Sequence, residues 1–62
     1  MSSEDVWEHL ERLGWQVKKN SLTTSEVTFE NEFMEGDITI PLGKKEVPSG
    51  ILNEIFKKAG LL

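Results

Sequence analysis

The chain offers few side chains that could perform acid–base or nucleophilic chemistry. His9 is its one histidine, and the sequence contains no cysteine. Without a second histidine or a thiol, no serine has a base at a recognisable spacing, so we predict no nucleophile–base pair. The position of His9 within an amphipathic segment indicates a residue at the surface or rim of a helix. Gly43 and Gly50 are isolated and do not form a phosphate-binding loop.

The lysines occur in pairs, whereas acidic residues dominate other segments. Residues 26–37 hold five carboxylates and no basic side chain. The net charge of −4 argues against a general nucleic-acid binder, whose affinity depends on Lys and Arg displacing counterions. An acidic protein can still have one basic face if its lysine pairs meet in the fold. These pairs are Lys18–Lys19, Lys44–Lys45 and Lys57–Lys58.

The acidic segment has two candidate roles. Its carboxylates lack the spacing of a calcium-binding loop, so the segment predicts a solvated hairpin and no metal site. Phe33 and Met34 interrupt it as an apolar pair. Together with Glu30, Glu32 and Glu35, they form a candidate surface for a basic protein partner. The other interpretation of the apolar pair is that it closes one end of the core.

The elements that must position these residues follow from hydrophobic periodicity. A helix is predicted over residues 3–13, after an N-cap at Ser2 or Ser3 and before Gly14. Period-two alternation predicts strands over residues 15–18, 25–30 and 37–41, with Pro41 ending the third. A second helix begins near Pro48 and ends at Gly60. The predicted fold is α+β, a single domain over residues 1–62 in the order α-β-β-β-α, with two helices on one face of a three-stranded antiparallel sheet.

A chain of 62 residues must bury nearly all of its large apolar side chains. One face of each strand is predicted to point at the helices, and residues 31–36 are predicted to connect the second and third strands. Leu61 or Leu62 is expected to pack back on the second helix. The predicted core residues are Val6, Trp7, Leu10, Leu13, Trp15, Val17, Val27, Phe29, Ile38, Ile40, Ile51, Leu52, Ile55, Phe56 and Ala59.

The sequence also predicts a compartment. The first residues are acidic and amphipathic, unlike the basic and then apolar start of a signal peptide. No apolar run approaches the roughly 20 residues that a membrane span needs. The absence of cysteine fits a reducing environment. We therefore expect a soluble cytoplasmic protein with no membrane contact and no cofactor.

The order and spacing of several motifs resemble the HicA family of small mRNA-cleaving toxins, which have a double-stranded-RNA-binding-domain-like fold. Gly14–Trp15 fits the family's Gly-aromatic pair after the first helix, and residues 37–41 fit its strand ending in proline. Lys44, Lys45 and residues 48–52 fit its basic loop and helix start, and residues 56–61 fit its end. The resemblance covers almost the whole chain. It implies RNA as a target and a HicB-like antitoxin as a partner.

The chain departs from the family where cleavage takes place. Counted from Gly14, the family's Gly-Ser-His turn falls at residues 22–24, so Thr24 stands where the catalytic histidine belongs. An imidazole can exchange a proton near neutral pH, whereas a threonine hydroxyl cannot. Leu42 also replaces a polar residue or histidine that many relatives have after the proline. The resemblance therefore implies a family member that has lost the nuclease or never had it.

Three hypotheses remain open at this point. The first is a non-catalytic HicA-like domain that binds the RNA backbone weakly, through Lys44 and Lys45 with the other lysine pairs in support. The second is a protein-interaction module, antitoxin-like or a phage-encoded inhibitor, that uses the acidic hairpin. The third is an active toxin whose catalytic group lies elsewhere.

Overall fold

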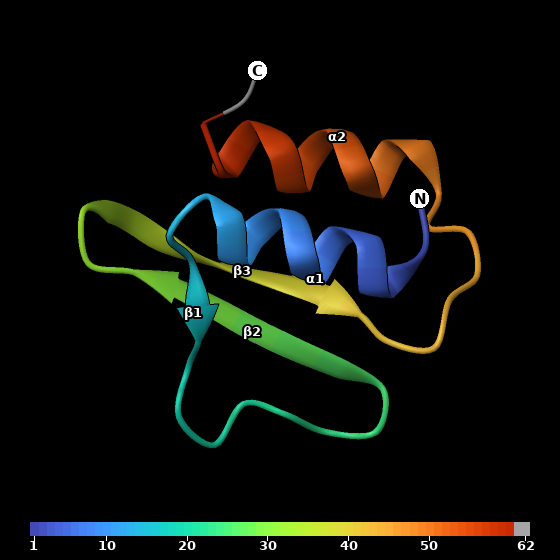
Figure 1. Ribbon diagram of the computed structural model, residues 1–62, viewed down its shortest axis with the longest axis horizontal. Coiled ribbons are helices and arrows are strands. Elements are labelled where there is room, and N and C mark those ends of the chain that lie inside the picture. The colour runs from blue at the N-terminus through green and yellow to red at the C-terminus, as the bar shows by residue number, and fades with distance from the viewer. Residues whose placement is uncertain (61–62) are drawn as a thin grey trace.

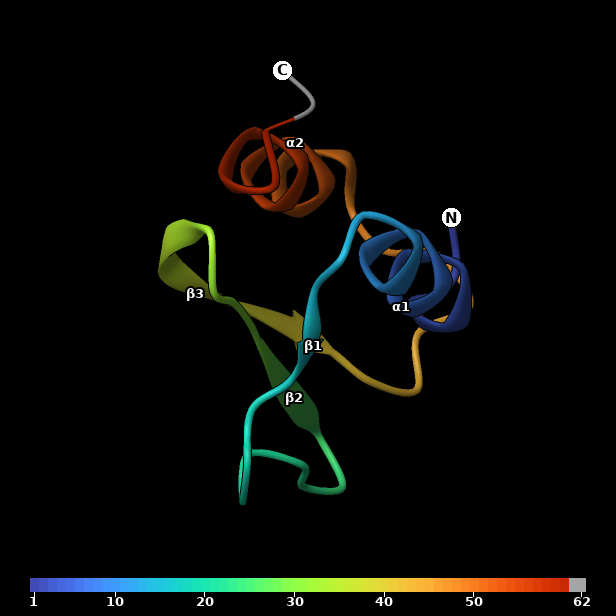
Figure 2. The same cartoon turned by 60° about the vertical axis from the view of Figure 1, so that its left-hand side comes forward.

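The computed structural model describes residues 1–60 and has the predicted order α-β-β-β-α. Helix α1 spans Ser3–Arg12, strands β1, β2 and β3 span Gln16–Val17, Glu26–Asn31 and Met34–Pro41, and helix α2 spans Ser49–Lys58. The strands form one antiparallel sheet in the order β1-β2-β3. Both helices lie over the same face of this sheet (Figures 1 and 2). The predicted fold class is confirmed. Among the described residues, neither helix has the length and apolar character that crossing a membrane requires.

The start and end of α1 are set by its own side chains. The Ser2 hydroxyl accepts a hydrogen bond from the Asp5 N–H at 3.2 Å, and the Asp5 carboxylate accepts one from the Ser2 N–H at 3.1 Å. The bond from the Ser2 N–H is the largest cause that lowers the pKa of Asp5. This reciprocal pair is a capping box. Gly14, with φ +92°, then turns the chain out of the helix.

The core lies between the sheet and the two helices. Val27 and Phe29 of β2 and Ile38 and Ile40 of β3 are buried, as their alternation predicts. The ring of Trp7 meets that of Phe29 edge to face, with centroids 5.2 Å apart. The other buried apolar residues are Val6, Leu10, Trp15, Val47, Ile55 and Ala59.

Three residues predicted to be in the core are exposed. Leu13 is the C-cap of α1, where the chain is already leaving the helix, and Val17 lies on the two-residue edge strand β1. Ile51 lies in the first turn of α2 and is 40% exposed, because the narrow sheet and α1 cover only the side of α2 that carries Ile55 and Ala59. The predicted contact of Leu61 or Leu62 lies outside the described residues.

The β2–β3 connection is shorter than predicted. Asn31 pairs with Met34, so only Glu32 and Phe33 form the turn, and β3 starts at Met34 rather than after Gly36. The Asn31 side-chain oxygen accepts the Phe33 N–H at 2.9 Å and shapes this turn. Gly36, with φ +86°, lies inside β3 where the register shifts. Its positive φ accommodates the extra residues of a bulge, not the hairpin turn.

Candidate functional site

The loop between β1 and β2 holds Thr24, the position at which the family resemblance implies a catalytic histidine. Residues 18–25 of this loop contain hydroxyl, amide and lysine side chains but no imidazole, carboxylate or thiol. The Thr23 hydroxyl accepts the N–H groups of Ser25 at 3.3 Å and Glu26 at 3.1 Å. The Thr23 N–H donates to the Glu26 carbonyl at 2.9 Å. Thr24 follows as an exposed residue at the bend.

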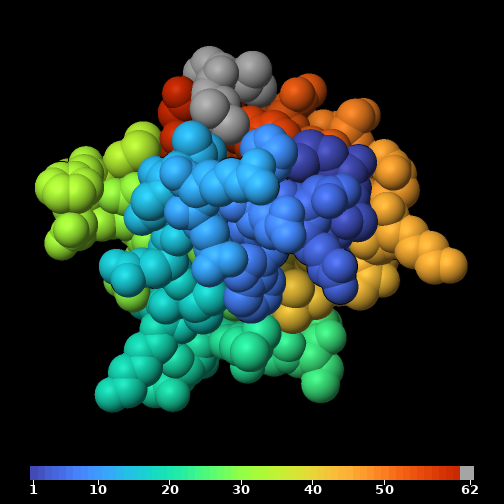
Figure 3. Space-filling model, viewed as in Figure 1, coloured from blue at the N-terminus to red at the C-terminus, as the bar shows by residue number. Residues whose placement is uncertain are grey.

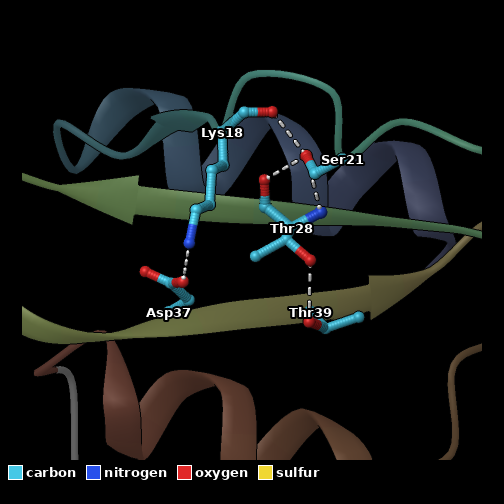
Figure 4. Close-up of polar contacts among 5 residues, drawn as sticks. All are labelled: Lys18, Ser21, Thr28, Asp37 and Thr39. Carbon is cyan, nitrogen blue, oxygen red and sulfur yellow. Dashed lines mark hydrogen bonds and ion pairs between the residues drawn. The ribbon is translucent and has the colours of Figure 1, made fainter.

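A second hydroxyl ends the pairing of β1 with β2. The Lys18 N–H donates to the Thr28 carbonyl at 2.8 Å. The return hydrogen bond of the ladder is replaced by the Ser21 side chain. The Ser21 hydroxyl accepts the Thr28 N–H at 3.3 Å and donates to the Lys18 carbonyl at 2.6 Å (Figure 4). A side chain therefore replaces one rung of the ladder, which explains why β1 is so short. No pattern in the sequence indicated this role of Ser21.

His9 lies in the layer of helices, whereas this loop belongs to the sheet. It projects from α1, and its ring lies 6.0 Å from that of Phe56 on α2. Figure 1 shows the β1–β2 loop extending from the sheet on the side away from both helices. His9 is exposed, as the sequence predicts for a residue at a helix surface. The structure therefore does not bring the one imidazole to the position of Thr24.

The three lysine pairs are carried by separate parts of the fold. Lys18 and Lys19 follow β1, Lys44 and Lys45 lie in the loop between β3 and α2, and Lys57 and Lys58 lie in the last turn of α2. These segments are at different corners of a flat molecule of 29 × 28 × 17 Å (Figure 1). The pairs therefore do not meet to form the single basic face considered from the sequence.

One of these lysines already has an acidic partner. The Lys18 ammonium lies 2.8 Å from the Asp37 carboxylate, on the face of the sheet that the helices leave open (Figure 4). Its hydrogen bond to Asp37 raises the pKa of Lys18, so the lysine stays charged. Beside this pair, the hydroxyls of Thr28 and Thr39 are 2.9 Å apart. Lys18 is thus partly committed to the sheet.

The loop that holds Lys44 and Lys45 is fastened to the start of α1. The Ser3 N–H donates to the Lys44 carbonyl at 2.9 Å, and the Ser3 hydroxyl accepts the Lys44 N–H at 3.0 Å. The Val47 N–H also donates to the Met1 carbonyl at 2.7 Å. In Figure 3 this orange loop lies against the dark blue N-terminal segment. A depression of about 310 Å³ lies between them, lined by Ser2, Ser3, Glu4, Gly43, Lys44 and Lys45.

The role of Ser3 leads to a stability prediction. Ser3 is 5% exposed, and a Ser3→Ala change leaves the Lys44 N–H without its acceptor. We expect a loss of about 1–3 kcal/mol in the free energy of unfolding. Ser49, the exposed first residue of α2, is the matched control, because α2 has no side-chain cap bond. Urea unfolding of Ser3→Ala and Ser49→Ala measures the difference, and equal midpoints would contradict this role.

The acidic hairpin carries the other candidate surface. Phe33 is 88% exposed at the turn, and Met34 beside it is 40% exposed. Glu32 and Glu35 flank them as exposed residues, while Glu30 lies further along β2 and is half-buried. The hairpin tip projects from the body of the molecule at the left of Figure 3. The structure thus groups four of the five predicted residues at the tip. Across residues 1–60, no cluster of carboxylate, imidazole or thiol groups could hold a metal ion.

Comparison with known proteins connects this geometry to a family. The family model for the HicA toxin of bacterial toxin–antitoxin systems matches residues 3–61. A solved structure, described as the HicA3 and HicB3 toxin–antitoxin complex, contains a chain that superimposes with a TM-score of 0.83 and 32% sequence identity. The match covers 98% of this chain and 96% of that one. No curated protein sequence gives a significant match.

Proposed function

The chain belongs to the HicA toxin family of bacterial toxin–antitoxin systems, and we propose that within this family it acts by binding and does not cleave RNA. The observation that carries the proposal is Thr24 in the β1–β2 loop. Its neighbours supply hydroxyls that are occupied in shaping the loop, and His9 lies in the helical layer. The test is incubation of the purified protein with a mixed mRNA pool, where we expect no cleavage.

The chemistry of Thr24 supports this proposal. Cleavage of RNA through its 2′-hydroxyl needs one group to remove a proton and another to protonate the leaving oxygen. A histidine serves because its pKa lies near neutrality, whereas an alcohol neither accepts nor releases a proton usefully at that pH. Lys19 in this loop can hold a phosphate as a charged group, while Lys18 is already paired with Asp37. Binding is therefore the activity that these side chains support.

The proposed partner is an antitoxin-type protein of the HicB kind. The matched structure is a complex of HicA3 with HicB3, and its HicA chain shares the fold of this one over nearly its full length. A family member without cleavage can still take part in such a system by occupying an antitoxin. The net charge of −4 supports a protein partner over RNA as the main target.

A second candidate target is the RNA backbone, and the Lys44–Lys45 loop favours it. This loop is held in place by Ser3, so both exposed lysines project from a fixed backbone. It leads into the start of α2, whose first turn contains no acidic residue and whose N–H groups form the positive end of the helix dipole. Glu4 lines the same depression and weakens its attraction for phosphate. We therefore propose weak binding without sequence preference.

The RNA candidate has a quantitative test. In a Lys44→Ala/Lys45→Ala variant, we expect duplex RNA binding to weaken and the slope of log K against log salt to flatten by about one unit for each lost phosphate contact. A Lys57→Ala/Lys58→Ala variant makes the same change in charge at another corner and should have a smaller effect. Fluorescence anisotropy over a salt series measures both. If the parent binds no duplex at low salt, or if the first variant binds as well as the parent, the RNA candidate is wrong.

A further inference from the structure

Phe33 is far more exposed than the other large apolar side chains of the described residues. The other two phenylalanines, Phe29 and Phe56, are buried and half-buried in or against the core. Phe33 is 88% exposed at the far end of the hairpin. Met34, whose terminal carbon would lie 3.4 Å from a Cβ at Gly60, already fills the space beside the end of α2. Phe33 therefore does not close the core.

The tip that presents Phe33 is built to be rigid. The Asn31 side-chain oxygen accepts the Phe33 N–H at 2.9 Å, and Asn31 pairs with Met34 across the two-residue turn. Met34 in turn lies against Gly60, which joins the hairpin to α2. A backbone held in this way loses little conformational freedom on binding. Exposed aromatic side chains on fixed backbone are typical anchors of protein interfaces.

The charges around the tip indicate what kind of surface it fits. Residues 26–37 contain five acidic residues and no basic one. Asp37 is paired with Lys18, which leaves Glu26, Glu30, Glu32 and Glu35 to set the potential of the hairpin. A complementary surface has an apolar pocket with lysine or arginine at its rim. A second copy of this chain presents the same acidic tip, so like charges oppose pairing of two tips.

We propose that Phe33 is the anchor by which an antitoxin-type partner holds this domain, inserting into an apolar pocket that is rimmed by basic side chains. Glu32 and Glu35 then guide the approach and set its orientation. This inference rests on the proposed function, because it assigns a surface to the proposed partner. It separates the partner site at the hairpin from the Lys44–Lys45 loop, which lies at another corner of the fold (Figure 1).

The test uses purified HicB3, the antitoxin of the matched complex, in isothermal titration calorimetry with the full chain. We expect Phe33→Ala to weaken binding by roughly 30-fold or more, the range of an interface hot spot. Leu22→Ala is the matched control, since Leu22 is another large apolar residue that is exposed, on the β1–β2 loop and not on the hairpin. A Glu32→Lys/Glu35→Lys variant should weaken binding in the same titration and reverse the dependence of the affinity on salt.

The outcomes separate the inference from the function on which it rests. Unchanged binding by Phe33→Ala, with the parent binding HicB3, overturns the inference and leaves the proposed partner standing. Failure of the parent to bind HicB3 contradicts the proposed partner itself. A parent that sediments as a dimer, and a Phe33→Ala variant that sediments as a monomer, would show that a second copy covers the tip. Because Phe33 is exposed, both alanine variants should keep the melting temperature of the parent, which excludes unfolding as the cause.

Discussion

Replacing Ile55 by alanine is expected to leave much of the protein unfolded at room temperature, whereas the same change at Ile51 is expected to be nearly neutral. Ile55 is 4% exposed and belongs to the core that α2 shares with the sheet. Removing buried methyl and methylene groups costs about 2–5 kcal/mol, because it forfeits both burial and packing. A domain of this size has only about 3–5 kcal/mol of stability in total. The surrounding core has few residues with which to fill the cavity.

Ile51 provides a control of identical chemistry one turn earlier in the same helix. It is ten times as exposed as Ile55, so its replacement removes less buried area, and alanine favours the helix slightly. We expect Ile51→Ala to change the free energy of unfolding by less than about 1 kcal/mol. Phe56→Ala should fall between the two, since Phe56 is partly buried. Urea unfolding followed by circular dichroism gives all three values, and similar midpoints for Ile51→Ala and Ile55→Ala would contradict this packing of α2.

This contrast shows what the sequence could and could not predict about the fold. Alternation in β2 and β3 correctly assigns Val27, Phe29, Ile38 and Ile40 to the buried face, since period two admits only two faces. A helical stripe is less specific, because periodicity does not say how wide a strip the sheet will cover. Ile51 and Ile55 therefore look equivalent in sequence and differ in the structure.

The contacts of the candidate site depend on residues that are distant in the chain. Ser3 meets Lys44, and Val47 becomes buried by docking its loop against Met1. Such pairings leave no local pattern in the sequence. The three lysine pairs can be read from the sequence, but the distance between one pair and another depends on how the helices and strands are arranged. The exposure of Phe33 could be suspected from its acidic neighbours, and the two-residue turn that fixes it depends on the Asn31 side chain.

Installing a histidine at position 24 is expected to create the largest change in activity. A Thr24→His variant places an imidazole, with an ordinary pKa near 6.5, on the exposed bend of the β1–β2 loop. General acid–base catalysis by one positioned group contributes roughly 10²–10⁴-fold in rate. If the missing imidazole is what prevents cleavage, Thr24→His should cut RNA and Thr24→Ala should not. The rate should depend on pH near neutrality, because both protonation states are needed there.

Incubation of the purified wild-type chain with RNA decides whether this domain binds without cutting. The protein is incubated in large excess with a labelled mRNA pool, alongside Thr24→His and His9→Ala variants prepared in the same way. We predict intact RNA with the wild type and with His9→Ala. The parallel preparations control for a contaminating nuclease, because such a nuclease would act equally in all of them. Cleavage by the wild type that disappears in His9→Ala would show that the chain is a nuclease whose catalytic group lies on α1.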